Sequence, residues 1–329
     1  MYSLIIPVYK NEESIPELVE VMTWLNTQLD GKLEAVFVVD GSPDKSAYLL
    51  QKLLPKQVFA SNLLLLSRNF GSFSAIRTGL QAATGPYFAV MAADLQEPPE
   101  LILDFFYSLD NDEADVVLGT RSTRRDPWLS RLISNIFWAT YRKFVVPQVP
   151  SGGVDVFGCN LAFRDCLQSF EEANTSLVAL IFWAGFRRKH VAYERRARKY
   201  GVSAWTFGKK FNYLMDSVFA FTDLPIKALL GLGTLGLLVS MIFAVVELIA
   251  HLSGHITVPG YVSTILVLLF FGALNMLGLG VAGSYAWRAY ENTKHRPAAV
   301  IARKIGYRGK GSKRKGTRHQ PTVSQSSKS

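Results

Sequence analysis

Short apolar runs alternate with amphipathic stretches in the N-terminal part of the chain. The runs predict strands at Leu4–Val8, Ala35–Val39, Leu63–Leu66, Tyr87–Ala92 and Asp115–Leu118. Apolar residues at helical spacing lie between them, as in Ile15, Leu18, Val19, Met22 and Leu25. Strands that are apolar throughout and alternate with helices are typical of a mostly parallel sheet covered on both faces. We therefore expect an α/β domain over residues 1–208.

Two longer apolar runs follow, from Ala228 to Ile249 and from Tyr261 to Trp287. Each contains at least the ~20 residues needed to cross the hydrocarbon core of a bilayer. They predict a transmembrane hairpin with helices at 226–250 and 261–287. The segment 209–225 is amphipathic and predicts a juxtamembrane helix lying in the membrane interface. Trp128–Val146 has a similar character, although an ordinary core helix explains it equally well.

The charge is concentrated after the hairpin. The net charge is +10, but twelve lysines and arginines and one acid follow position 287, which leaves the preceding residues close to neutral. This distribution argues against a nucleic-acid partner and predicts a basic tail at 288–329, disordered towards its end and close to anionic lipid. Lysines also precede the hairpin, and its linker, His251–Gly260, contains none. The positive-inside rule places both termini and the α/β domain in the cytoplasm, on a multi-pass protein of the plasma membrane.

A cluster of polar residues follows each predicted strand. The clusters are Tyr9–Glu12, Asp40–Ser42, Arg68–Gly71, Asp94–Gln96 and Gly119–Arg121. Open α/β sheets bind ligands at this edge, so we expect a site there, although any one cluster could be turn chemistry.

The chemistry available at this edge is narrow. It has no dinucleotide fingerprint and no P-loop lysine, and the five histidines lie elsewhere. The two cysteines rule out a disulfide framework, and no zinc spacing is present. Carboxylates, amides and arginines remain, which are suited to a metal–diphosphate ligand.

Taken together, the motifs resemble family 2 glycosyltransferases. The residues that carry the resemblance are Ile6-Pro7-Val8-Tyr9, Asp40-Gly41-Ser42, Arg68-Asn69-Phe70-Gly71 and Asp94-Leu95-Gln96. With the hairpin, the chain is similar to the polyisoprenyl-phosphate glycosyltransferases of that family from residue 1 to about 287. The resemblance implies a GT-A fold, a nucleotide-sugar donor, a polyisoprenyl-phosphate acceptor in the cytoplasmic leaflet and an Mg²⁺ or Mn²⁺ ion.

The resemblance also implies roles for individual residues. Pro7, Tyr9, Glu12, Asp40 and Asn69 would bind the nucleotide. Asp94 and Gln96 would hold the metal. The residues implied near the sugar and the phosphates are Arg121, Asp155, Arg195, Arg198, Ser203 and Trp205.

The chain departs from the family pattern at three positions. Ala92 replaces the first acid of the metal-binding motif, Val39 replaces an Asp before Asp40, and Ala204 replaces a Lys after Ser203. Loss of one carboxylate weakens a site for a hard cation, although Asp94, Gln96 and the donor diphosphate could still complete it.

The acceptor chemistry fits this set of residues. A phosphate monoester has its second pKa near ~6, so it is mostly a dianion at neutral pH and needs no strong general base. Its negative charge must be neutralised instead, for which Arg121, Arg124, Arg125, Arg195, Arg196 and Arg198 are candidates. In-line attack would invert the anomeric carbon.

Two alternatives stay open. A processive polysaccharide synthase is one, although such enzymes generally have more membrane spans. A catalytically silent membrane scaffold is the other, and Ala92 is the residue that favours it. A homo-oligomer and a partner that flips the lipid-linked sugar are further interactions that the sequence leaves open.

Overall fold

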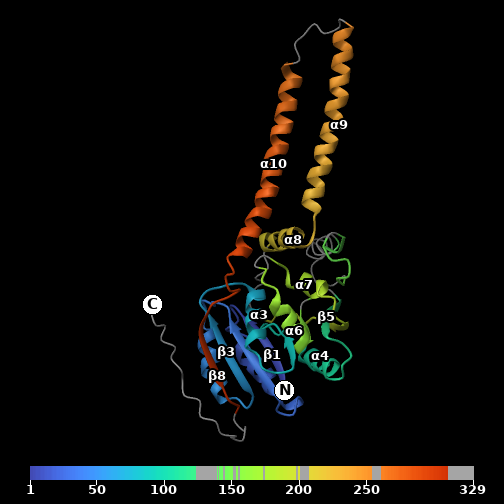
Figure 1. Cartoon of the computed structure of the whole chain (residues 1–329). Helices are drawn as coiled ribbons and strands as arrows, with labels where there is room; N and C mark the ends of the chain where they lie inside the picture. The colour runs from blue at the N-terminus through green and yellow to red at the C-terminus, as the bar shows by residue number, and fades with distance from the viewer. Residues whose placement is uncertain are drawn as a thin grey trace, which may run out of the picture.

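The structure of the protein, a computed structural model, describes residues 1–123, 139, 141–143, 145–150, 153–154, 156–172, 175–197, 199–200, 207–253 and 261–309. Figure 1 shows an α/β domain from which a long helical hairpin projects. The predicted α/β sheet and C-terminal hairpin are thereby confirmed.

The described strands form one eight-stranded sheet in the order β7-β5-β6-β4-β1-β2-β3-β8. Its central strands are parallel, with β1 between β4 and β2, and β2 next to β3. The strands are β1 (Tyr2–Val8), β2 (Leu33–Val39), β3 (Ala60–Leu66), β4 (Tyr87–Val90), β5 (Val116–Thr123), β6 (Phe157–Asn160), β7 (Arg188–Glu194) and β8 (Ile301–Tyr307).

Alternate residues of the central strands pack on opposite faces of the sheet. Leu4 and Ile6 of β1 belong to one buried cluster, and Ile5 belongs to the other. The first cluster includes side chains of α1 (Ile15–Gln28), α2 (Ser46–Leu53) and α4 (Pro99–Asp110). The second includes side chains of α3 (Ser72–Ala82), α6 (Leu161–Ser169) and α7 (Leu177–Trp183). Burial on both faces explains why the strands are apolar throughout.

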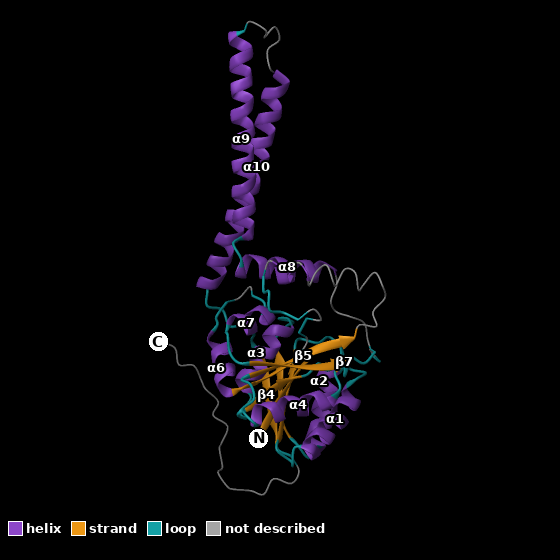
Figure 2. Ribbon diagram, turned by 90° about the vertical axis from the view of Figure 1, so that its right-hand side faces the viewer, coloured by secondary structure: helices purple, strands orange, loops and turns teal. Residues whose placement is uncertain are grey.

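The hairpin consists of α9 (Leu224–Leu252) and α10 (Tyr261–Thr293), preceded by α8 (Phe207–Phe221). Both long helices are long and apolar enough to cross a membrane, and 6% and 0% of their most apolar stretches are buried. Exposure of so much apolar surface argues against a pair of core helices. In both views α8 lies across the base of the hairpin (Figures 1 and 2). Its Tyr213 and Leu214 pack against the second core cluster.

The sheet differs from the sequence prediction at several points. Strand β6 enters antiparallel between β4 and β5, β7 pairs parallel with β5, and β8 pairs antiparallel with β3. None of these three strands was predicted. Strand β5 was expected to end at Leu118 but continues to Thr123, so Arg121 lies within the strand and not after it. The reason is that β6 pairs with β5 only as far as Leu118, whereas β7 pairs with it up to Thr123.

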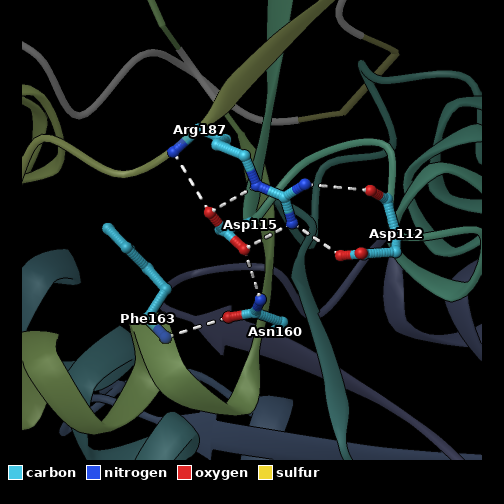
Figure 3. Close-up of polar contacts among 5 residues, drawn as sticks. All are labelled: Asp112, Asp115, Asn160, Phe163 and Arg187. Atoms are coloured by element: carbon cyan, nitrogen blue, oxygen red, sulfur yellow. Dashed lines mark hydrogen bonds and ion pairs between the residues drawn. The ribbon is translucent and has the colours of Figure 1, made fainter.

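A polar cluster joins β5, β6 and β7 where β5 and β7 begin (Figure 3). Arg187 donates two hydrogen bonds of 3.1 Å to the carboxylate of Asp115 and one of 2.6 Å to Asp112. Asn160 donates to Asp115 and accepts from the backbone of Phe163, which caps α6. The hydrogen bonds from Arg187 lower the pKa of Asp115. Because this cluster lies at the N-terminal ends of β5 and β7, it stabilises the edge opposite the candidate site.

Candidate active site

The candidate site lies at the C-terminal ends of the parallel strands. In Figures 1 and 2 the start of β1 lies at the end of the domain that is farthest from the hairpin. Strand β1 therefore runs towards α8, as do its parallel neighbours β2 and β4. The edge that open α/β sheets use for ligands thus faces α8 and the hairpin.

The loops after β1 and β2 are held together by Asp44. One carboxylate oxygen accepts hydrogen bonds from the Ser42 hydroxyl (2.6 Å) and the Ser46 backbone (3.2 Å). The other accepts from the Ser46 hydroxyl (2.9 Å) and the Glu12 backbone (3.0 Å). Burial disfavours the charged form of Asp44, but these hydrogen bonds outweigh burial and lower its pKa. In return, the Glu12 carboxylate accepts from the Lys45 backbone at 2.8 Å.

The loop after β3 is fixed by Asp40. This residue is 3% exposed, and its two carboxylate oxygens accept hydrogen bonds from the backbone N–H groups of Phe70 (2.7 Å) and Gly71 (2.9 Å). The side chain of Asn69 donates to the Asp40 carbonyl at 3.2 Å. A buried carboxylate that accepts two backbone hydrogen bonds holds the Arg68–Gly71 loop against the end of β2.

Gly41 permits the close contact between these two loops. Its φ of +57° is in the left-handed region, and a Cβ there would lie 2.3 Å from the backbone carbon of Arg68. A side chain at position 41 would therefore push the two loops apart.

The loop after β4 meets a segment that is distant in sequence. Gln96 is 8% exposed, and its amide oxygen accepts a hydrogen bond of 2.6 Å from the Arg195 guanidinium. Its amide nitrogen donates to the Arg196 carbonyl at 3.3 Å, and the Arg196 backbone donates to the Gln96 carbonyl at 2.9 Å. Asp94 is half-buried two residues earlier, and Ser14 at the start of α1 donates to the Ala93 carbonyl at 2.8 Å. This half of the edge thus combines a carboxylate with two arginines.

After β7 the chain reaches α1, and we call residues 195–197 and 199–200 the strap. Arg196 forms an ion pair of 3.5 Å with Glu100 at the start of α4. Lys199 (2.7 Å) and Tyr200 (3.0 Å) both donate to the carboxylate of Glu17 on α1. These two hydrogen bonds lower the pKa of Glu17. The strap is therefore attached to both α4 and α1.

A divalent cation can be accommodated here with Asp94 as the carboxylate ligand. Mg²⁺ in phosphate sites is commonly held by one or two carboxylates together with substrate oxygens and water. Within the described ranges, no cluster of three His, Cys, Asp or Glu side chains forms an all-protein metal site. The amide oxygen of Gln96 accepts from Arg195, so a metal bound to Gln96 would share this oxygen with the guanidinium. That role stays a prediction.

The structure brings most of the predicted site residues to one edge. Pro7 and Tyr9 are half-buried at the end of β1. The hydrogen bonds between loops described above hold Glu12, Asp40 and Asn69 in the same half of the edge. Asp94, Gln96 and Arg195 lie in the other half, and Arg121 is half-buried in the distal part of β5. Asp155, Arg198, Ser203 and Trp205 lie outside the described residues, as do Arg124, Arg125, Ala204 and most of Trp128–Val146.

The sequence analysis did not identify Asp44 and Glu17. Asp44 could have been noticed, since it precedes α2 and lies two residues after the Gly41-Ser42 turn. Glu17 carries no local signal, because its partners are 182 and 183 residues away. Arg187 and Lys189 pair with Asp112 and Glu113 near the starts of β5 and β7, away from this edge.

Comparisons with known proteins agree with this arrangement. Residues 3–168 match the family model for glycosyl transferase family 2. The CsbB glycosyltransferase of Bacillus subtilis is 31% identical over 92% of this chain and 91% of its own length. The bactoprenol glucosyl transferase of Shigella phage SfV is 28% identical over 91% of this chain and 97% of its own. The undecaprenyl-phosphate 4-deoxy-4-formamido-L-arabinose transferase of Proteus mirabilis is 29% identical over 92% and 94%.

The family match covers half of the chain, from β1 through α4 and β5 to α6, and so includes the strand ends described above. The similarity to the three relatives continues through the hairpin. These findings agree with the GT-A arrangement expected from the motifs. The chain belongs to glycosyltransferase family 2.

Proposed function

We propose that the protein transfers one sugar from a nucleotide-diphosphate sugar to a polyisoprenyl phosphate in the cytoplasmic leaflet. The product is a lipid-linked sugar that serves as a donor for modification of cell-envelope glycans. The observation that carries this proposal is that Gln96, two residues after Asp94, binds Arg195 and Arg196 at a sheet edge that faces two long apolar helices. The names of two relatives, a bactoprenol and an undecaprenyl-phosphate transferase, support the same acceptor class.

The donor nucleotide would lie over the ends of β1, β2 and β3. Pro7, Tyr9, Glu12, Asp40 and Asn69 surround this position. The hydrogen bonds of Asp40 and Asp44 fix the loops before the donor binds, which reduces the entropy lost on binding. Asp94 would hold the divalent cation, which would stabilise the leaving diphosphate as a Lewis acid.

The arginines would bring the acceptor phosphate to the donor. Gln96, two residues after Asp94, is bonded to the Arg195 guanidinium and to the Arg196 backbone, and Arg121 lies in the distal part of β5. Guanidinium groups bind phosphate through paired hydrogen bonds and reduce the repulsion between two anionic substrates. The acceptor dianion can then attack the anomeric carbon opposite the diphosphate, with inversion, and no side chain has to remove a proton.

The fold supports an arrangement in which both ends of the hairpin are on one side of the membrane. The chain enters α9 from the α/β domain, and β8, which follows α10, pairs with β3 of the same domain. The lysine-rich flanks favour the cytoplasm for that side.

The experiment that tests the proposal is a transfer assay on membranes containing the protein. Labelled nucleotide sugars are offered one at a time with undecaprenyl phosphate, and the organic extract is counted. One donor should yield an organic-soluble labelled product that requires the added acceptor. Label in a water-soluble polymer would favour a processive synthase. Donor binding without transfer by any member of the panel would favour the catalytically silent scaffold that Ala92 keeps open.

The orientation is tested by cysteine labelling. Ser253→Cys, at the end of α9, is introduced after Cys159 and Cys166 are changed to Ser. An impermeant maleimide should label this cysteine in intact cells, and a cysteine added at the C-terminus should react only after lysis. The opposite labelling pattern would overturn the orientation.

A further inference from the structure

Strand β8 connects the membrane hairpin to the candidate donor site. It follows α10 after a short link and pairs antiparallel with β3 over Ile301–Tyr307. Strand β3 ends at Leu66, just before the Arg68–Gly71 loop. The N–H of the next residue, Ser67, donates to the carbonyl of Val300, just before β8, at 2.9 Å. The loop after β3 is therefore fixed on one side by Asp40 and on the other by the segment that leaves the membrane.

Strand β8 is held against the α/β domain by buried side chains as well as by its backbone pairing with β3. Ile305 and Tyr307 pack against the core cluster that contains α1 and α2, while Ala299 packs against the cluster on the other face. Gly309 lies so close to the segment before β3 that a Cβ on Gly309 would be 2.1 Å from the Val58 carbonyl oxygen. Residues 299–309 thus fit the α/β domain closely, in contrast to a tail held only by charge.

We propose that β8 positions the Arg68–Gly71 loop, so that the segment after the second membrane helix forms part of the donor site. The proposal rests on the proposed function only in identifying this loop with donor binding. When β8 is docked, the N–H groups of Phe70 and Gly71 stay aligned on Asp40. When it is not, β3 becomes an open edge and the loop loses its contact with Val300.

Matched substitutions in the full-length protein separate docking from charge. Ile305→Asp places a carboxylate against the core and should release β8. Ala302→Asp makes the same charge change at an exposed position of the same strand. A chain that lacks residues 301–329 is compared with one that lacks only 310–329, so that the result does not depend on one substitution.

The first readout is hydrogen exchange in detergent, which needs no substrate. Amides of residues 67–71 should exchange about tenfold faster in Ile305→Asp and in the shorter chain, with β1 and β2 still protected. Ala302→Asp and the chain ending at 309 should match the wild type. The proposal would be overturned if residues 67–71 exchanged at the wild-type rate although β8 was released in Ile305→Asp or missing from the shorter chain. It would also be overturned if the amides of β1 and β2 lost their protection together with residues 67–71, because β8 would then stabilise the whole domain.

The second readout is kinetic, with UDP-glucose as the probe. Ile305→Asp should raise the donor KM about tenfold and change kcat by less than about threefold, and Ile305→Val should restore the KM. A fall in kcat with an unchanged KM would contradict positioning of the donor loop. If the wild type transfers no sugar from any donor, the proposed function fails, while the exchange result still decides whether β8 positions the loop.

Discussion

The two halves of the candidate active edge are held together in different ways. Over β1, β2 and β3, the carboxylates of Asp40 and Asp44 accept hydrogen bonds from backbone N–H groups and serine hydroxyls, and these hydrogen bonds join residues at most 32 positions apart. Over β4, β5 and β7, the side chain of Gln96 meets the strap about one hundred positions later in the chain.

This difference indicates that one half mainly maintains the structure and the other mainly serves the reaction. Backbone groups bonded to buried carboxylates form a rigid frame, because moving them leaves buried polar atoms unsatisfied. The ion pairs of the strap are exposed, and exposed ion pairs contribute little to stability. We therefore expect loss of Asp44, which belongs to this frame, to lower mainly stability, and substitutions in the second half to lower activity in a protein that remains folded.

The largest effect is expected from Asp94→Asn, in the second half. With Ala92 beside it, Asp94 is the one carboxylate that the Ala92–Gln96 motif offers to a cation. Transfer should fall by about a hundredfold or more, because stabilisation of the leaving diphosphate is lost. The measurement is initial rate across a titration of Mg²⁺ and Mn²⁺, with Asp104→Asn on the exposed face of α4 as the control. Turnover like that of the wild type would remove the metal role assigned to Asp94.

Gln96→Ala should have the next largest effect. Its side chain is almost fully buried and holds both Arg195 and Arg196, so its loss frees the strap. Because these arginines would bind the acceptor phosphate, we expect the KM for the acceptor to rise about tenfold, with little change in melting temperature. Gln81→Ala, at an exposed position of α3, is the matched control. A large loss of stability with an unchanged KM would place Gln96 in the structural frame instead.

Much of this edge could be predicted from the sequence, but its assembly could not. Apolar strands and the polar residues that follow them are local patterns, so Asp40, Asn69 and Asp94 were found. The contact of Gln96 with Arg195 and that of Glu17 with Lys199 depend on how β7 and the strap return over the sheet, which no short motif records. Strand β8 escaped prediction for the same reason. Its sequence, Ile-Ala-Arg-Lys-Ile-Gly-Tyr, has two adjacent basic residues and no regular alternation of apolar and polar positions, and it lies in a basic tail. Only pairing with β3 makes it a strand.

In the first half, Asp44→Asn should lower stability and leave the kinetics nearly unchanged. Hydrogen bonds to a charged group are replaced by weaker ones, so the free energy of unfolding should fall by about 1–2 kcal/mol. The pKa of Asp44 is lowered in the folded protein. Its contribution is therefore complete above the unfolded value near ~4 and is lost as pH falls through the folded value.

Thermal denaturation in detergent at several pH values measures this effect, with Asp104→Asn as the control. The difference between the wild type and Asp44→Asn should be constant near neutral pH and shrink below about pH 4. A difference that grows in acid would contradict the role given to Asp44.

The smallest effect is expected from Glu17→Gln, which weakens the attachment of the strap to α1. The KM for the acceptor should rise about threefold, and the melting temperature should stay within error of the wild type. Glu20→Gln, on the exposed side of the same helix, is the control. Equal KM values for the two variants would show that the strap is fixed without Glu17.

The central claim is that the acceptor phosphate attacks the sugar and displaces the nucleotide as a diphosphate. The most direct test is to identify the nucleotide released by the purified protein with undecaprenyl phosphate and the donor found in the transfer assay. We expect nucleoside diphosphate in equal amount to a lipid whose mass is that of the acceptor plus one sugar residue. Release of nucleoside monophosphate, with a lipid that carries an additional phosphate, would contradict the account.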